Sequence, residues 1–225
     1  MVITSGPDEA ADIAAGAVER LLASNPDAVL GLATGSSPVP TYRLLIERHR
    51  SGRLSFARSR AFLLDEYVGL PADHAESYRA FIDREFTGQV DFGPEAVDGP
   101  DGTVGLDRAG DDLATAGQTY EEQISRAGGI DLQLLGIGGD GHIGFNEPVS
   151  SLGSRTRLKT LTEETRADNA RFFGGDIDAV PRHVITQGIG TILEARHLVM
   201  IATGESKAGP IARAVEGPLT AMVPA

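Results

Sequence analysis

The residues best suited to chemistry lie in one segment, Leu135–Pro148, which reads LGIGGDGHIGFNEP. Within it, two carboxylates and an imidazole, those of Asp140, Glu147 and His142, stand among glycines that permit tight backbone turns. An apolar run, Ile130–Ile137, leads into the segment and predicts a strand that is covered on both faces. Because open α/β sheets bind their ligands beyond the carboxyl ends of the strands, we predict that this loop belongs to an active site.

His142 is the natural proton carrier of this loop, since imidazole changes its charge near neutral pH. A histidine held by a backbone carbonyl in the core is the structural alternative, but two carboxylates in a glycine loop favour the catalytic interpretation. A metal site at Asp140, His142 and Glu147 is the competing chemistry, and it is disfavoured because the spacing matches no established ligand motif. A serine triad is weaker still, because no G-x-S-x-G motif occurs.

A second glycine turn, Thr34–Pro38, joins a predicted strand at Ala28–Ala33 to a predicted helix at Val39–Arg50. Backbone N–H groups, hydroxyls and a helix N-terminus suit a phosphate, and they are offered there by Gly35, Ser36 and Ser37. The turn lacks the lysine of a P-loop, and an ordinary capped helix start is the structural alternative. Lys207 favours the phosphate site, because it follows a predicted buried strand, Leu198–Ala202, in a comparable turn and brings a compact positive charge.

Asp65 ends a third apolar run, Ala61–Leu64. In a parallel sheet the ends of these strands meet at one edge, which brings Asp65 toward His142. A carboxylate in that position is suited to act as a general base on a carbon acid if the pocket excludes water. An isolated aspartate after a strand more often caps a loop, so the catalytic interpretation depends on the neighbours of Asp65.

The elements that must position these residues alternate along the chain. Apolar residues after Pro7 and Asp8 recur with a helical period, which predicts an opening amphipathic helix. The other predicted elements are helices at Ser77–Phe86, Leu113–Arg126, Glu163–Phe173 and from Ala208 to Glu216, short strands at Arg157–Leu161 and His183–Gln187, a turn at Gly188–Gly190, and an irregular surface stretch at Asp91–Asp107. This alternation favours an α/β fold, a single three-layer domain with a mostly parallel, Rossmann-like sheet and helices on both faces.

Composition narrows the classes of partner. The chain of 225 residues has 32 acidic and 20 basic residues, a formal charge of -12, which opposes broad attraction to nucleic acid or to an anionic membrane. A small anionic ligand therefore needs a local basic pocket. Cysteine is absent, which excludes disulfides and thiolate metal sites. No signal peptide or membrane-spanning run is recognisable, so we expect a cytoplasmic protein with no membrane partner.

Several segments together resemble the glucosamine-6-phosphate deaminase family over essentially the whole chain. The matching segments are ATGSSP at 33–38, LDEYVGL at 64–70, GIGGDGHIGFNEP at 136–148, SRTR at 154–157, NARFF at 169–173 and GESKA at 204–208. The 6-phosphogluconolactonases, which are similar in fold, share the glycine-rich Asp-Gly-His loop but do not continue with Ile-Gly-Phe-Asn-Glu-Pro. The stretch Phe145–Pro148 therefore favours a resemblance to the deaminases.

The resemblance implies conversion of glucosamine 6-phosphate and water to fructose 6-phosphate and ammonia, without a metal or another cofactor. It implies that His142, oriented by Asp140 and Glu147, assists opening of the sugar ring. Asp65 would move a proton from C2 to C1 of the open sugar through an enolamine. The residues implied to hold the phosphate are Gly35, Ser36, Ser37, Arg171 and Lys207. Arg171 would lie on a mobile lid formed by Leu161–Val184, although a solvated helix face is its structural alternative.

Regulation is implied by the same resemblance. Some members of the family are hexamers activated by N-acetylglucosamine 6-phosphate, so a homo-oligomer with this effector is an expectation for the chain. The residues that resemble the effector's phosphate site are Ser150, Ser151, Arg157 and Lys159. A single domain over residues 1–225 is expected, ending at Ala225, before the further strand and tail usual in the family. The alternatives are a sugar-phosphate lactonase and a sugar-phosphate sensing module without turnover.

Overall fold

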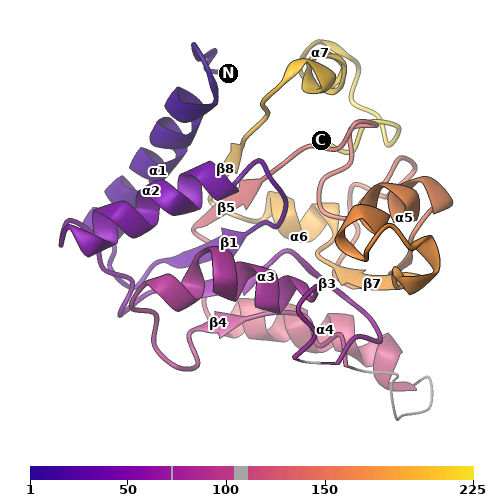
Figure 1. Ribbon diagram of the computed structural model, residues 1–225, viewed down its shortest axis with the longest axis horizontal. Helices are drawn as coiled ribbons and strands as arrows, with labels where there is room; N and C mark the ends of the chain where they lie inside the picture. The colour runs from indigo at the N-terminus through magenta and orange to yellow at the C-terminus, as the bar shows by residue number, and fades with distance from the viewer. Residues whose placement is uncertain (72, 104–110) are drawn as a thin grey trace.

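A five-stranded parallel sheet forms the centre of the protein in the computed structural model, which describes residues 1–71, 73–103 and 111–225 (Figure 1). The spatial order of its strands is β4-β2-β1-β5-β8, with neighbours in parallel register throughout. The strands are β1 (Val29–Leu32), β2 (Arg60–Leu63), β4 (Val97–Asp98), β5 (Leu132–Leu135) and β8 (His197–Met200). All carboxyl ends therefore meet at one edge, as the sequence predicts.

Helices cover both faces of this sheet, which confirms the predicted α/β class. Leu30 and Leu32 of β1 face a core cluster that includes residues of α1, α2 and α3. Val29, one position along and on the opposite face, packs against Tyr120 of α4, and Ala33 lies in a cluster with Ile192 of α6. These helices are α1 (Pro7–Ser24), α2 (Val39–Arg50), α3 (Tyr78–Glu85), α4 (Asp111–Arg126) and α6 (Ile189–Leu193).

A second sheet of three antiparallel strands lies beside the first, and the sequence did not predict it. It consists of β3 (Asp65–Tyr67), β7 (His183–Thr186) and β6 (Arg157–Thr160), in that order. Asp65 pairs with Thr186, although the two are far apart in the sequence. Between β6 and β7 the chain forms α5 (Glu163–Asn169) and two short 3-10 helices at Ala170–Phe172 and Ile177–Ala179, all within the predicted lid.

Four local predictions need correction. The strand near residues 198–202, predicted to be buried, is the edge strand β8, and its Leu198 is 43% exposed. An apolar run cannot distinguish a central strand from an edge strand. The helix predicted at Glu163–Phe173 ends at Asn169, and residues 188–190 lead into α6 instead of forming only a turn. The stretch 91–107 contains β4, and its residues 104–107 lie outside the described residues.

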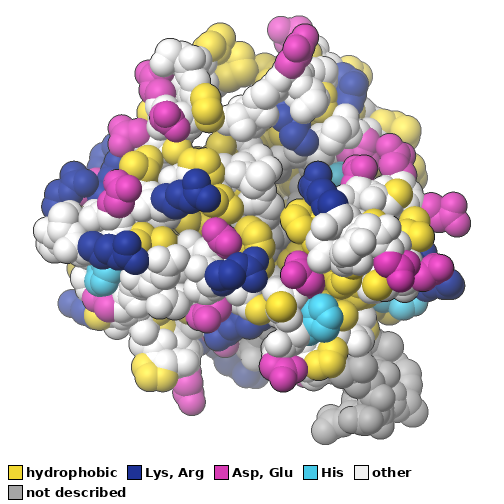
Figure 2. All heavy atoms as spheres, viewed as in Figure 1, with side chains coloured by type: hydrophobic (Ala, Val, Ile, Leu, Met, Phe, Trp, Pro, Cys, Tyr) yellow, Lys and Arg dark blue, Asp and Glu magenta, His cyan; other side chains and the backbone are white. Residues whose placement is uncertain are grey.

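The last elements lead from the main sheet back over its edge. A 3-10 turn at Glu205–Lys207 follows β8, and α7 (Ala208–Glu216) continues from it. Earlier in the chain, another 3-10 turn, Thr87–Gln89, follows α3. In the part of the chain that the structure describes, no helix has the length and apolar character needed to cross a membrane. On the face in Figure 2, basic side chains are interspersed with acidic ones and form no continuous basic patch.

Candidate active site

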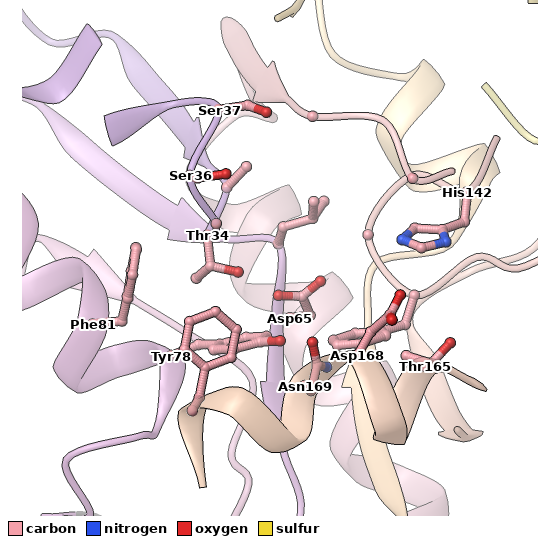
Figure 3. Close-up of a pocket in the computed structure, with 18 of the residues that line it drawn as sticks. Thr34, Ser36, Ser37, Asp65, Tyr78, Phe81, His142, Thr165, Asp168 and Asn169 are labelled. Carbon is pink, nitrogen blue, oxygen red and sulfur yellow. The ribbon is translucent and has the colours of Figure 1, made fainter. Parts of the chain in front are cut away.

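A cavity of about 280 Å³ opens at the carboxyl edge of the parallel sheet. Its walls come from the turns after β1, β2, β5 and β8, with α5 and the following 3-10 turn closing one side (Figure 3). The residues predicted from sequence that line it are Gly35, Ser36, Ser37, Asp65, His142, Arg171 and Lys207. The structure thus brings together residues from five separate segments of the chain. Asp140 and Glu147 do not line the cavity.

Asp65 presents a buried carboxylate to this cavity. The residue is only 3% exposed, and its Oδ1 is buried without a hydrogen-bond partner among the described residues. Burial, together with the nearby charge of Glu66, raises the pKa of Asp65 well above its usual range. A carboxylate that is poorly solvated and unpaired is more basic than one in water, which suits it to remove a proton from carbon.

Glu66 is buried too, but its carboxylate is used for structure. It accepts hydrogen bonds from the backbone N–H groups of Tyr67, Tyr78 and Arg79, at 2.8, 2.9 and 2.8 Å. Burial raises the pKa of Glu66, while these three bonds act in the opposite direction. Glu66 therefore fixes the start of α3 against β3, whereas Asp65 stays free to meet a substrate.

His142 faces the same cavity from the loop after β5 (Figure 3). Its Nδ1 lies 2.7 Å from Asp140 Oδ1, an ion-pair distance, although the ring is turned off the line that a hydrogen bond prefers. Asp140 Oδ1 also accepts the backbone N–H of His142 at 3.0 Å. Gly138 makes room for the ring, since a Cβ there would lie 2.3 Å from His142 Nδ1. Asp140 therefore lies beside His142, and its expected role in orienting the ring stays a prediction.

Glu147 is placed differently from the prediction that it orients His142. Among the described residues, no hydrogen bond joins Glu147 to His142. Its Oε1 instead accepts the hydroxyls of Thr165 at 2.6 Å and Thr162 at 2.9 Å. Neither threonine was predicted from the sequence. A signal was available for Thr162, because it immediately precedes the predicted helix that starts at Glu163, and threonine is a common N-cap residue.

The predicted phosphate residues all line the cavity. Gly35, Ser36 and Ser37 form the turn that leads into α2, and the N-terminus of this helix has no side-chain cap. Such a helix start is suited to an anion. Arg171 and Lys207 line the same cavity, and within the described residues neither has an ion-pair partner. The Arg171 guanidinium lies over the ring of Phe172, 4.8 Å from its centroid. Two cations in one cavity with the turn that precedes α2 suit a phosphate.

An aromatic wall opposite His142 was missed from the sequence. Tyr67 Oη accepts a hydrogen bond from Asn169 Nδ2 at 2.9 Å and lies 3.3 Å from Tyr78 Oη. Burial raises the pKa of Tyr67 to about 12, so its hydroxyl stays protonated. Alternation along β3 was the available signal, because residues two apart on a strand face the same side and Tyr67 follows Asp65 by two.

The predicted regulatory residues lie apart from the cavity and in different environments. Ser150 is 4% exposed, and its Oγ is buried without a partner in the described chain, whereas Ser151 is exposed. Arg157 and Lys159 lie two residues apart on β6, so they are on the same side of the strand. The Arg157 guanidinium donates to Asn146 Oδ1 at 3.0 Å, and burial lowers the pKa of Arg157.

The loop of residues 136–148 is arranged for proton transfer and is held by the C-terminal segment. Across the described residues, no three His, Asp or Glu side chains converge as metal ligands, and Asp140, His142 and Glu147 do not form such a group. The loop is also braced from the C-terminal segment, because Arg213 donates to Gly139 O at 3.2 Å and Ala221 O accepts from Val149 N at 2.8 Å. What the geometry offers is proton transfer beside an anion site.

Known proteins similar to this chain point the same way. A family model described as "Glucosamine-6-phosphate isomerases/6-phosphogluconolactonase" matches residues 7–225. Two curated relatives, each named "Glucosamine-6-phosphate deaminase", come from Beutenbergia cavernae and Mycolicibacterium smegmatis. Each is 57% identical over 225 residues, which is 100% of this chain and 84% of the relative.

Solved structures show the same relationship. A structure described as a monomeric glucosamine-6-phosphate deaminase is 40% identical, with a TM-score of 0.92 over 98% of this chain and 89% of that one. A 6-phosphogluconolactonase from Trypanosoma cruzi is 23% identical, with a TM-score of 0.75 over 97% of this chain and 85% of that one, and shares the fold. The chain therefore belongs to the family of glucosamine-6-phosphate isomerases and 6-phosphogluconolactonases, on its glucosamine-6-phosphate deaminase branch.

Proposed function

We propose that this chain converts glucosamine 6-phosphate and water to fructose 6-phosphate and ammonia. The observation that carries the proposal is the placement of Asp65, a buried carboxylate without a partner in the described chain, in one cavity with His142 and with the cations Arg171 and Lys207. An anion site fixes the phosphate end of the sugar, and a base and a proton carrier face the remaining space. The curated relatives that bear the deaminase name support the assignment.

His142 has the first task, which is opening the sugar ring. A proton passes from the C1 hydroxyl to the ring oxygen as the C1–O5 bond breaks, and the imidazole is placed to carry it. Asp140 lies against Nδ1, which leaves Nε2 for the substrate. Such a positioned proton carrier contributes about 10²- to 10⁴-fold.

Asp65 has the second task, which is moving a proton from C2 to C1. It removes the C2 proton of the open aldose, and the C2–H electron pair forms the C1–C2 double bond as the C1=O π electrons move to O1, which takes up a proton from water to give an enolamine. The proton held by Asp65 then returns to C1 as the nitrogen lone pair forms the C2–N double bond. The product is an imine at C2. Water adds to that carbon, the C–N bond breaks, and ammonia leaves with the ketone of fructose 6-phosphate. The aromatic wall of Tyr67 and Tyr78 keeps the surroundings of Asp65 poor in water.

The test is turnover of glucosamine 6-phosphate by the purified chain, measured as ammonia and as fructose 6-phosphate. A substrate deuterated at C2 should react more slowly, because the C2 bond breaks in the proposed step. Equal amounts of both products support the proposal. Folded protein that releases no ammonia, or that hydrolyses 6-phosphogluconolactone instead, contradicts it.

Regulation by N-acetylglucosamine 6-phosphate, a homo-oligomer that supports it, and a cytoplasmic location are separate parts of the proposal. Arg157 and Lys159 lie two residues apart on β6 and therefore on the same side of the strand, which supports a second phosphate site. The solved deaminase cited above is described as monomeric. Ammonia release with and without the effector, in the wild type and in Lys159→Ala, tests regulation; no response in the wild type would remove this part alone.

A further inference from the structure

Glu147 is held from outside its own loop. The hydroxyls of Thr165 and Thr162 both donate to its Oε1, at 2.6 and 2.9 Å. Glu147 is only 8% exposed, so water cannot freely replace these bonds. A buried carboxylate that loses its hydrogen bonds is costly, and the side chain would turn toward another partner.

The two threonines have different duties. Thr162 is the N-cap of α5, and its Oγ1 accepts the backbone N–H of Thr165 at 3.2 Å. Its removal would therefore damage the helix start as well as the bond to Glu147. Thr165 lies inside the helix and lines the active-site cavity, where Figure 3 shows it on the same side as Asp168 and Asn169. Thr165 alone joins Glu147 to the helix without being needed to cap it.

The other end of α5 leads to Arg171, which lines the same cavity. Asn169 is the last residue of the helix, and Arg171 follows in the 3-10 turn. Arg166, in the middle of the helix, is 8% exposed and donates to Ile177 O at 2.6 Å and to Val180 O at 3.3 Å. The helix is thereby tied to the segment that follows the Arg171 turn.

We propose that Thr165 is a positioning residue that connects α5 to the catalytic loop. Its hydroxyl donates to the Glu147 carboxylate. When Arg171 binds a phosphate, the position of α5 becomes fixed, and the bond between Thr165 and Glu147 then fixes the position of the loop that carries His142. At 1.5 Å per residue, the seven-residue helix spans about 10 Å, short enough to transmit a shift without bending. The inference rests on the proposed function, because it assumes that Arg171 binds the substrate's phosphate.

Thr165→Val tests it, since valine keeps the shape and removes the hydroxyl. Loss of a hydrogen bond to a charged group should lower kcat by about 10- to 100-fold, with KM changed less than about threefold. Thr165→Ser restores the hydroxyl and should recover kcat to within about threefold of the wild type. Thr160→Val is the matched control, because Thr160 is exposed on β6, its hydroxyl lies 3.3 Å from His183 Nδ1, and it does not touch Glu147.

Hydrogen exchange of the ligand-free proteins gives a second readout that needs no turnover. Amides of residues 143–150 should exchange faster in Thr165→Val than in Thr165→Ser or the wild type. A Thr165→Val protein with unchanged kcat, or a serine variant as impaired as the valine variant, overturns the inference. If the wild type itself releases no ammonia, the proposed function fails. The Thr165 connection is then judged by hydrogen exchange alone, and equal amide exchange rates at residues 143–150 in Thr165→Val and the wild type overturn it.

Discussion

Replacing Gly138 with alanine should misplace His142 while leaving every titratable side chain of the site in the protein. A Cβ at this position would lie 2.3 Å from Cε1 and Nδ1 of the His142 ring and 2.5 Å from Nε2. Because non-bonded carbon atoms settle at about 3.5 to 4.0 Å, the ring must move by about 1 Å or more. A displacement of that size at a reacting group costs about 10²-fold, so kcat for ammonia release should fall about 100-fold.

The fold should tolerate this change. The side chain of His142 is 30% exposed, so the ring has room to swing toward solvent instead of compressing the core. We therefore expect a loss of unfolding free energy at the lower end of the range for overpacking, about 1 kcal/mol. Thermal unfolding measures that loss, and steady-state ammonia release measures kcat and KM on the same preparation.

Gly139→Ala is the matched control, because a Cβ at Gly139 meets no atom within 4 Å. Its kcat should fall far less than that of Gly138→Ala. The reasoning is refuted if Gly138→Ala keeps the wild-type kcat while folded, or if both alanine variants lose activity equally, since contact with the His142 ring would then decide nothing.

Substitutions at three further residues test the remaining parts of the site. Asp65→Asn should lower kcat by about 10²- to 10⁴-fold. Because burial raises the pKa of Asp65, the wild type should lose stability relative to Asp65→Asn as the pH rises from about 4 toward the raised pKa; a constant difference in urea unfolding would contradict this. Arg171→Lys keeps a charge but loses the paired donors, so KM should rise about tenfold and rise further in Arg171→Ala; an unchanged KM in both would place the phosphate elsewhere. Arg213→Ala should lower kcat and speed amide exchange at residues 139–142, whereas unchanged exchange would show that the bond to Gly139 O does not brace the loop.

Much of the fold could be predicted because its signals are local. The bounds predicted for α2, Val39–Arg50, agree with the structure. Apolar runs located the strands of the main sheet other than β4, and their glycine turns located the edge where the cavity lies. Seven of the predicted site residues line that cavity, namely Gly35, Ser36, Ser37, Asp65, His142, Arg171 and Lys207. Alternation of strand and helix allows few arrangements, and a parallel sheet gathers its strand ends at one edge.

What could not be predicted depends on pairing between distant segments. In the second sheet, β3 pairs with β7, and Asp65 lies opposite Thr186. No local sequence pattern in either strand indicates which strand is its partner. Leu198 is exposed because β8 lies at the edge of the sheet. The apolar sequence of β8 does not indicate whether the strand is central or at the edge. In the same way, the contact between Glu147 and Thr165 required knowing that α5 folds back over the loop after β5.

The amino-acid sequence by itself determined which chemical groups are present and which turns can carry them: a carboxylate after β2, an imidazole after β5, and cations where a phosphate can bind. Tertiary structure decided what each group is able to do. Burial without a partner in the described chain makes Asp65 basic, whereas three backbone N–H groups fix Glu66, its neighbour, as a structural carboxylate. The reason is physical, because basicity and orientation depend on solvent exclusion and hydrogen bonds, and only the packed chain provides these.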